Sequence, residues 1–439
     1  MTKKLVLAIF LLAVLTFSLF SCDDNSDGGP AVSGNVVTLN VYNWGEYISD
    51  GFEGSLDTNA AFEEYFNTHL ASKYGYSIKV NYTTYATNED MYFKLASEAG
   101  NYDVIIPSDY MIEKMINEGM LAELDYSIIT NFEYIDDGFK GDAAYYDPDN
   151  KHSVPYTYGM LGVIYNTALV DEEDYLEESW GLLWNPKYRG KILQFNNPRD
   201  AFGSAMYYMN MDINSTDPAV WDSALAKLVQ QKEYLQGYVN DEIFNKMTTA
   251  SAAIAPYFAG DFLTMAYQNE DLAFYYPIEG TNYFVDAMCI PKNSRNKDAA
   301  NEYINFMLSE EVAVANALYI GYASPNTLVL DNEEYSEGMA ELHDDWWDIL
   351  YGKTPAEANE EYDYSPGYKS FSPEIQAHVN ALWESLKTEN ATEPWVHITS
   401  ITIIVAVIAL AVYTVYIRKK RSRHYRLRDR ENALKKIGK

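Results

Sequence analysis

Alternating and helical patterns of apolar residues follow one another along the chain from residue 37 onward. Val37–Tyr42 and Ile78–Tyr82 alternate and are rich in β-branched residues, which predicts two strands. Asn59–Lys73 has helical spacing, and Thr87–Leu95 opens with a sequence that resembles a helix capping box. Strands that alternate with helices of this length predict an α/β fold with parallel strands covered by helices.

The pattern continues with a predicted strand at Asp103–Pro107 and a helix at Tyr110–Gly119, and it starts again near Val154. Further strands are predicted at Val154–Tyr156, Gly162–Tyr165 and Lys191–Phe195, and helices at Asp217–Tyr238 and Asn296–Leu308. The restart predicts a second α/β unit. The acidic and aromatic stretch Asp331–Asp363 is predicted to be a solvated flank. Ligands of such sheets bind beyond the carboxyl ends of the strands.

The N-terminal end is typical of an exported protein. Lys3 and Lys4 precede an apolar run that ends at Phe20, which predicts a signal peptide over residues 1–21. Leu19-Phe20-Ser21-Cys22 resembles a bacterial lipoprotein signal, in which Cys22 is lipidated. Ordinary cleavage with an incidental Cys22 is the alternative. The polar, glycine-rich residues that follow predict a flexible tether over residues 22–36.

The C-terminal end contains a second apolar run. Ile398–Ile417 holds 20 residues without a charge, enough to span about 30 Å of hydrocarbon, and we expect a transmembrane helix over residues 396–417. Arg418-Lys419-Lys420-Arg421 follows directly, so the positive-inside rule predicts a cytoplasmic tail over residues 418–439. The body would then lie on the extracytoplasmic face of a cell membrane, in contact with membrane lipid only through its ends.

The charge of the chain is strongly acidic and unevenly distributed. Its net charge is −32, and because the last 22 residues carry +9 and Lys3 and Lys4 carry +2, residues 22–417 carry −43. This acidity argues against nucleic-acid binding, which depends on neutralising phosphates. It is compatible with a cationic ligand, although solubility alone also explains excess surface charge.

No sequence motif of an enzyme is present. The chain lacks GxSxG, GxxxxGK[ST], HExxH and CxxC, so we expect no enzymatic activity, cofactor or metal. His343-Asp344-Asp345 could ligate a metal, but a solvated charged turn is the favoured explanation. Only two cysteines occur; with Cys22 lipidated no disulfide could form, and Cys289 lies in an apolar run as a packing residue.

Aromatic residues and carboxylates occur together at the predicted strand ends. The chain has 39 Tyr, 18 Phe and 8 Trp, and the clusters are Trp44–Tyr47, Ser108–Tyr110 and Tyr283–Asp286. An organic amine needs this combination, because carboxylates pair with its ammonium groups while aromatic faces cover its methylenes and attract its charge. Each cluster alone is also explained by loop or core packing; the three together favour an amine site.

These motifs resemble the spermidine/putrescine-binding proteins of bacterial ABC importers. The matching stretches are Tyr42–Tyr47, Ile78–Leu95, Tyr102–Ser108, Ser179–Lys191 and Ile320–Asn326, in order over nearly the whole body. The resemblance implies a two-lobed, periplasmic-binding-protein-like α/β fold with a ligand cleft between the lobes. We expect lobe 1 to hold residues 37–153 and 285–330, and lobe 2 to hold 154–284 and 331–388.

The resemblance also implies a polyamine ligand, spermidine or putrescine, and permease subunits of an ABC importer as partners. The site residues that it implies are Trp44, Glu46, Tyr47, Ser108, Tyr110, Asn197, Asp200, Phe258, Phe284, Asp286 and Tyr322. Glu46, Asp200 and Asp286 would carry most of the selectivity.

The chain departs from the family's pattern at several of these positions. Asn197 stands where the family has an acid, and Phe258 and Phe284 stand where it usually has tryptophan, which weakens the cation–π face. Asp261 could restore the lost charge. The preference between spermidine and putrescine therefore stays open, and the transmembrane helix is not part of the usual pattern.

Two other functions remain open from the sequence. The same clamp could sense a cation and signal through the membrane helix, although the 22-residue tail is too short for a catalytic domain and would require a partner. An extracellular hydrolase that uses paired acids is the third reading, and no motif favours it.

Overall fold

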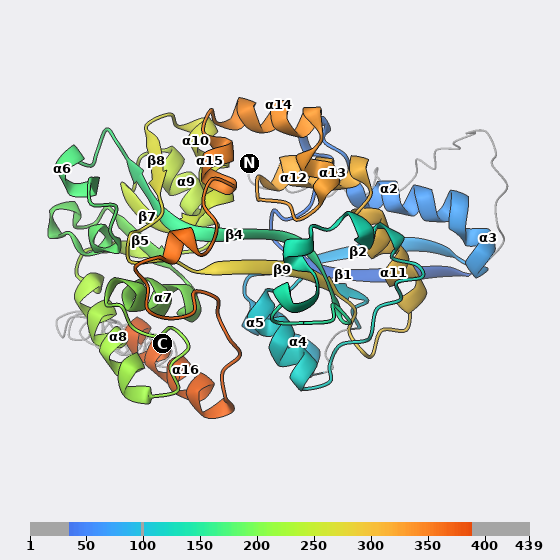
Figure 1. Cartoon of the computed structure of the whole chain (residues 1–439), viewed down its shortest axis with the longest axis horizontal. Helices are drawn as coiled ribbons and strands as arrows, with labels where there is room; N and C mark the ends of the chain where they lie inside the picture. Colours follow the sequence, from blue (N-terminus) through green and yellow to red (C-terminus); the bar gives the residue numbers. More distant parts are fainter. Residues whose placement is uncertain (1–34, 98–100, 389–439) are drawn as a thin grey trace, which may run out of the picture.

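The computed structural model describes residues 35–97 and 101–388 (Figure 1). The strands are β1 (Val36–Trp44), β2 (Ser77–Tyr85), β3 (Val104–Ile105), β4 (Ser153–Asn166), β5 (Ile192–Phe195), β6 (Leu235–Val239), β7 (Ile254–Phe258), β8 (Leu272–Tyr275) and β9 (Tyr283–Cys289). The α-helices are α2 (Thr58–Tyr65), α3 (Ala71–Tyr74), α4 (Asn88–Ala96), α5 (Asp109–Asn117), α6 (Glu172–Tyr175), α7 (Pro198–Tyr208), α8 (Pro218–Lys232), α9 (Glu242–Thr248), α10 (Ala259–Gln268), α11 (Lys297–Met307), α12 (Glu310–Ile320), α13 (Thr327–Leu330), α14 (Glu333–Leu342), α15 (Trp346–Leu350) and α16 (Pro373–Thr388).

The described strands form one mixed sheet in the order β2-β1-β3-β9-β4-β7-β5-β6, with β8 paired to β4. The pairs β1–β2, β1–β3, β5–β6 and β5–β7 are parallel, as the alternating pattern predicts. The pairs that involve β4 or β9 are antiparallel. Parallel strands therefore lie in two separate halves of the sheet, joined by an antiparallel centre.

Strand β4 crosses from one half of the sheet to the other. Its first residues, Ser153–Met160, pair with β9, and the following residues, Leu161–Asn166, pair with β7 and β8. Figure 1 shows β4 and β9 running between the two halves. The sequence prediction of two separate strands at Val154–Tyr156 and Gly162–Tyr165 is wrong, because one strand of 14 residues covers both. The lobe boundaries predicted near residues 154, 284 and 330 stay a prediction.

The predicted helix Asp217–Tyr238 is too long at its C-terminal end. Helix α8 ends at Lys232, and residues from Leu235 onward form β6, which pairs in parallel with β5. Gly237 lies within this strand and is a poor helix former. Hydrogen bonds to β5 thus replace the helical hydrogen bonds that these backbone groups would make in a longer helix.

The prediction of a solvated flank at Asp331–Asp363 is also wrong in part. Helices α14 and α15 lie in this stretch, and Tyr335 and Met339 are fully buried, with Trp346 and Tyr362 nearly so. The acidic side chains lie on the solvent face of these helices, and the opposite face packs on the body. The stretch is therefore amphipathic, which its acidic composition does not reveal.

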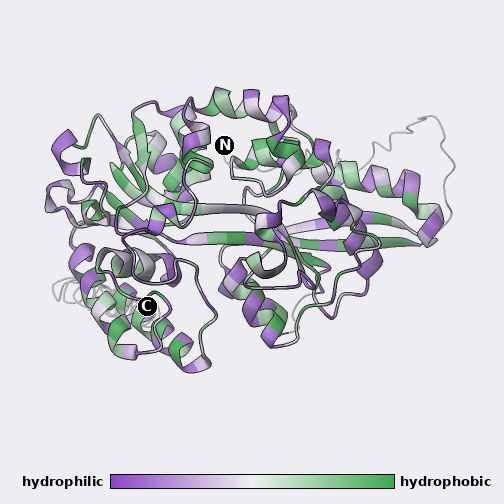
Figure 2. Ribbon diagram, in the orientation of Figure 1, coloured by the Kyte–Doolittle hydropathy of each residue, from purple (hydrophilic) through white to green (hydrophobic). Residues whose placement is uncertain are grey.

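The core runs through both halves of the sheet. One continuous cluster of buried residues includes Leu39 and Val104 from the first half and Leu193 and Ile254 from the second. In Figure 2 hydrophobic and hydrophilic residues alternate along the helices, as expected of helices with one face against the core. Cys289 is fully buried in a smaller cluster under β1 and α5, which agrees with the packing role predicted for it.

The predicted membrane segments lie outside the described residues. These are the signal peptide (1–21), Cys22, most of the tether (22–36), the transmembrane helix (396–417) and the basic tail (418–439). Within residues 35–97 and 101–388, no helix combines the length and the apolar character needed to cross a membrane.

Candidate functional site

A cavity of about 470 Å³ lies between the two halves of the sheet. Its walls come from the loop after β1, the starts of α4 and α5, the starts of α7, α9 and α10, and strand β9. The cavity brings together all of the site residues implied by the sequence: Trp44, Glu46, Tyr47, Ser108, Tyr110, Asn197, Asp200, Phe258, Phe284, Asp286 and Tyr322. That they bind a ligand stays a prediction.

The sheet explains why these distant residues meet. Trp44–Tyr47 follow β1, Ser108 precedes α5 after β3, Asn197 and Asp200 follow β5, and Phe258 ends β7. In each half these strands are parallel, so their carboxyl ends lie along one edge. The side chains that follow the strands therefore gather in the space between the halves.

Asp286 lies on β9 at the centre of the cavity and is 5% exposed. Its Oδ2 accepts a hydrogen bond of 2.7 Å from the hydroxyl of Tyr47, which in turn lies 2.5 Å from the hydroxyl of Thr157. Its Oδ1 has no hydrogen-bond partner among the described residues. Burial raises the pKa of Asp286 to about 6, although the nearby hydroxyls of Ser108 and Tyr47 act in the opposite direction.

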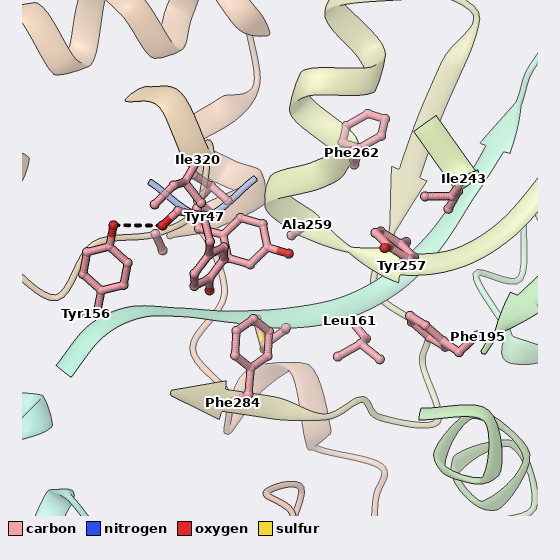
Figure 3. Packing of buried hydrophobic residues seen from close by; sticks show 14 of the residues in the cluster. Tyr47, Tyr156, Leu161, Phe195, Ile243, Tyr257, Ala259, Phe262, Phe284 and Ile320 are labelled. Atoms are coloured by element: carbon pink, nitrogen blue, oxygen red, sulfur yellow. Dashed lines mark hydrogen bonds between the residues drawn. The ribbon is translucent and has the colours of Figure 1, made fainter. Parts of the chain in front are cut away.

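Four aromatic rings stand beside Asp286, and we call Tyr47, Phe258, Phe284 and Tyr322 the aromatic box. The ring centroids of Phe258 and Phe284 are 5.3 Å apart, those of Phe284 and Tyr322 6.1 Å, and those of Tyr47 and Tyr322 5.5 Å. Figure 3 shows Tyr47 and Phe284 on either side of β4, with Tyr47 anchored by a hydrogen bond of 3.2 Å from Tyr156 to its carbonyl oxygen.

Asp261 provides a second carboxylate beside the aromatic box. It lies in the first turn of α10, and its Oδ2 accepts a hydrogen bond of 2.6 Å from the Tyr322 hydroxyl. Burial raises the pKa of Asp261 to about 7; the Tyr322 hydrogen bond lowers it and Asp241 raises it. The sequence pointed to Asp261 only as a compensating charge for Asn197, and the structure places it in the same cavity.

Asn197 and Asp200 are joined by two hydrogen bonds at the start of α7. Asn197 caps the helix by accepting from the Asp200 backbone N–H at 2.9 Å, and its Nδ2 donates to Asp200 Oδ2 at 2.8 Å. The Tyr368 hydroxyl lies 3.1 Å from Asp200 Oδ1. Burial raises the pKa of Asp200, opposed by these two hydrogen bonds and by the charge of Arg199. Asp200 is 8% exposed, so little of it faces solvent.

Several cavity residues were missed by the sequence analysis. Tyr368 comes from the segment before α16, and Arg199 is hidden inside the motif that supplies Asn197 and Asp200. Glu89 occupies the first turn of α4. Asp109, in the first turn of α5, belongs to the predicted cluster Ser108–Tyr110 but was not among the implied site residues. An acid in the first turn of a helix that follows a strand is a usable signal, but here it also serves the helix dipole, which made it easy to dismiss.

Asp109 is 1% exposed and lies behind Asp286. Its carboxylate accepts from the Tyr145 hydroxyl and from the Val285 backbone N–H at 3.3 Å. Burial, with a smaller contribution from the nearby Asp286, raises the pKa of Asp109 to about 7, although its hydrogen bonds act in the opposite direction. Because the two carboxylates lie in one buried region, ionisation of Asp286 makes ionisation of Asp109 less favourable.

Glu46 lies at the rim of the cavity. It is exposed, has a positive φ of 51°, and its Oε2 lies 3.4 Å from the Tyr319 hydroxyl. Asp241 and Glu242 are exposed rim residues on the opposite half. Among the three acids expected to carry the selectivity, Glu46 is thus the one in contact with solvent.

The cavity as a whole is acidic. Eight carboxylates line it, from Glu46, Glu89, Asp109, Asp200, Asp241, Glu242, Asp261 and Asp286, and Arg199 is the one basic side chain among the lining residues. Such a cavity, walled by low-dielectric aromatic rings, concentrates a negative potential and attracts cations. Neutral hydroxyls rather than basic side chains hold Asp261 and Asp286, so their charge is left for a ligand.

Comparisons with known proteins agree with this arrangement. Residues 100–351 match the family described as bacterial extracellular solute-binding protein. The chain is 31% identical over 290 residues to the spermidine/putrescine-binding periplasmic protein of Escherichia coli K12, which covers 66% of this chain and 78% of that protein. It is 28% identical over 345 residues to the putrescine/cadaverine-binding protein of Pseudomonas aeruginosa, covering 75% and 87%.

A solved structure shares both fold and sequence. The spermidine/putrescine ABC transporter substrate-binding protein of Streptococcus pneumoniae, solved with calcium and HEPES, superposes with a TM-score of 0.60 at 32% identity. The match covers 80% of this chain and 98% of that protein. The two-lobed α/β fold of the described residues is therefore that of a periplasmic-binding-protein-like protein.

Proposed function

The chain belongs to the bacterial extracellular solute-binding proteins, and we propose that it binds a linear polyamine outside the cytoplasm and delivers it to an ABC import permease. One observation carries the proposal most directly. Asp261 and Asp286 lie in one cavity beside the aromatic box, and neither has a basic side chain as a hydrogen-bond or ion-pair partner among the described residues. A buried carboxylate without a cation is costly, and an ammonium group supplies what is missing.

The aromatic box suits the rest of such a ligand. Methylene groups between the ammonium groups lose contact with water against Phe258 and Phe284, which gains about 0.8 kcal/mol per buried methylene. Each ammonium near a ring face gains roughly 0.5–2 kcal/mol more. The relatives' names include spermidine, putrescine and cadaverine, all of them linear amines of this kind.

Delivery follows from the position of the cavity. Because the walls come from both halves of the sheet, a ligand that contacts both halves favours the closed arrangement over the open one. A permease that recognises the closed arrangement would then receive loaded protein selectively. The relatives' names place them in the periplasm, and we infer that the body of this chain is also extracytoplasmic.

Attachment to the membrane is proposed from the sequence alone. The uncharged run Ile398–Ile417 followed by Arg418–Arg421 would anchor the C-terminus, and Cys22 would provide a lipid anchor. We expect the full chain to sediment with membranes after carbonate washing. A chain that carries Cys22→Ala and stops at residue 395 should be released; retention of this variant would contradict both anchors.

Isothermal titration calorimetry with the purified full-length chain tests the ligand class. We expect micromolar or tighter binding of putrescine or spermidine. Asp286→Asn should weaken it by 10-fold or more, about 1.4 kcal/mol, because it removes the central negative charge. Asp331→Asn, at an exposed position outside the cavity, is the matched control and should leave the affinity unchanged.

The proposal fails if neither amine binds at micromolar concentration to the folded chain. It also fails at its central residue if Asp286→Asn binds as tightly as the unmodified chain while both give the same circular dichroism spectrum. Co-purification with permease subunits from the native membrane would support delivery, whereas co-purification with a kinase or chemotaxis receptor would favour sensing instead.

A further inference from the structure

The region around Asp200 differs from the rest of the cavity because it combines a carboxylate that has protein partners with a buried basic side chain. We call Asn197, Arg199, Asp200 and Tyr368 the Asp200 corner. Both carboxylate oxygens of Asp200 have protein partners, the amide of Asn197 at 2.8 Å and the hydroxyl of Tyr368 at 3.1 Å. A ligand ammonium would have to displace one of them to reach Asp200.

Arg199 supplies a fixed positive charge at this corner. Its guanidinium is 4% exposed and lies 3.8 Å from the ring centre of Phe371, 4.3 Å from that of Tyr368 and 5.1 Å from that of Tyr110. Its Nη2 donates to the Lys369 carbonyl oxygen at 3.2 Å. Three rings and one hydrogen bond thus hold this cation inside an acidic cavity, while its Nε and Nη1 have no hydrogen-bond partner among the described residues.

Glu89, the other acid near this corner, is also engaged within the chain. Its Oε1 accepts a hydrogen bond of 3.1 Å from the Tyr110 hydroxyl, and the ring of Tyr110 contacts Arg199. Burial raises the pKa values of both Glu89 and Asp200, and the positive charge of Arg199 opposes this rise at each. Arg199 therefore acts electrostatically on both acids.

Tyr368 is packed tightly enough to act as a fixed wall. It is 5% exposed, its hydroxyl also lies 3.1 Å from the Arg199 carbonyl oxygen, and its ring meets Tyr110 edge-on at 6.1 Å. A Cβ atom on Gly203 would lie 2.4 Å from the Tyr368 hydroxyl, so the missing side chain at residue 203 makes room for it. The ring cannot move toward α7 without a clash.

We propose that Arg199 and Tyr368 are specificity-determining residues that close the Asp200 corner and leave a site for two ammonium groups, so that the chain prefers a diamine to a triamine. This inference rests on the proposed function. Asp286 and Asp261 each hold only hydroxyl partners and take one ammonium each, with the methylene chain along the aromatic box. A third ammonium at the corner meets Arg199, and like charges at close range repel strongly at low dielectric.

Calorimetry with the full-length chain tests the preference. The ligands are putrescine, cadaverine and spermidine, with 1-aminobutane as a monoamine control. We expect a diamine to bind at least 10-fold more tightly than spermidine and 1-aminobutane to bind weakest. Equal affinities, or tighter binding of spermidine, would overturn the inference while leaving polyamine binding intact; the absence of any binding would overturn the proposed function itself.

Two variants of Arg199, one neutral and one charged, separate the effect of its charge from the effect of its size. Arg199→Met removes the positive charge and should raise spermidine affinity at least 5-fold relative to putrescine. Arg199→Lys keeps the charge and should keep the diamine preference. If both variants show the preference of the unmodified chain, Arg199 does not set it.

Two further variants keep the test decisive if Arg199→Met does not fold. Tyr368→Ser removes the ring but keeps a hydroxyl, and Asn197→Asp adds an acid to the corner; each should raise the affinity for spermidine at least 3-fold relative to that for putrescine. Tyr267→Ser, an exposed tyrosine on α10, is the matched control. An unchanged ratio of affinities in both corner variants would refute the inference.

Discussion

Asp109, Asp261 and Asp286 carry raised pKa values for the same physical reason. Each is withdrawn from water and receives hydrogen bonds from hydroxyl or backbone donors instead of an ion pair. Burial raises the pKa of Asp286 to about 6 and those of Asp109 and Asp261 to about 7. Near neutral pH the empty cavity thus holds fewer negative charges than its sequence suggests.

Ligand affinity should therefore rise with pH between 5 and 8. The amines stay protonated over this range, but Asp261 and Asp286 must lose protons to pair with them. We expect at least a 10-fold gain in affinity from pH 5 to pH 8, and a net release of protons on binding near pH 6.5. Calorimetry in buffers of different ionisation enthalpy measures both; a flat profile with no proton release would contradict the raised pKa values.

The stability of the unliganded chain should change in the opposite direction at these groups. A carboxyl whose folded pKa is raised binds its proton more tightly in the folded state, so this contribution to stability is lost as pH rises from about 4 to about 7. Asp261→Asn should raise the melting temperature at pH 8 and leave it nearly unchanged at pH 4, as measured by circular dichroism. Equal effects at the two pH values would show that Asp261 is not titrating in this range.

The sequence led to the cavity residues that belong to contiguous motifs and missed those that reach it by packing. Asp286 and Tyr47 are found because they belong to the short clusters of aromatic and acidic residues Tyr283–Asp286 and Trp44–Tyr47. Tyr368 gives no such signal, because its role depends on the space above Gly203 and on the side chain of Arg199. Shape complementarity between distant segments cannot be read from one sequence.

At the scale of elements, the site depends on how closely the start of α10 approaches the end of α12. A Cβ atom on Gly260 would lie 2.0 Å from Cδ1 of Tyr322 and 2.9 Å from the Gly321 carbonyl oxygen. Gly321 ends α12 with a φ of 75°, a left-handed conformation that glycine adopts without strain. This contact sets Tyr322 against Asp261.

Gly260→Ala should therefore disturb both stability and binding. We expect a loss of about 1–3 kcal/mol in the free energy of unfolding, since backbone and ring must move to accept the methyl group, and at least a 5-fold loss in amine affinity. Gly237→Ala is the control, because a Cβ there meets no atom within 4 Å. Denaturant unfolding and calorimetry measure the two effects; a Gly260→Ala chain as stable as Gly237→Ala would contradict the close approach.

Elements were predicted well where one pattern covered them and poorly where glycine had a packing role. Thr87 accepts a hydrogen bond from the Asp90 backbone N–H at 3.1 Å, as the capping-box pattern predicts. The single strand β4 was instead predicted as two strands, and it contains Gly159 and Gly162. They accommodate the rings of Phe284 and Phe274, which would lie 3.1 and 2.2 Å from a Cβ there.

At the scale of the whole molecule, the two halves of the sheet are joined by a shared strand and a shared core rather than by a flexible linker. Strand β4 contributes to the pairing of both halves, and one buried cluster continues through them. Either half without the other would expose apolar core residues and unpaired strand groups. The halves should therefore stabilise each other.

Unfolding of the described body should accordingly occur in one transition. We expect far-ultraviolet circular dichroism and tryptophan fluorescence to give the same urea midpoint for the full-length chain. A saturating diamine should move that midpoint upward without splitting it, because the ligand contacts both halves. Two separated transitions would show that the halves unfold independently.

The pairing of β3 also fixes an order of events during synthesis. Ile105 pairs with Cys289, so β9, which completes the first half of the sheet, is made only after strands β4 to β8 have been translated. Until then β3 has an open edge, and the N-terminal part of the chain cannot complete its side of the sheet. Because this pairing joins residues far apart in sequence, we expect the first half to form in a late, cooperative step of folding.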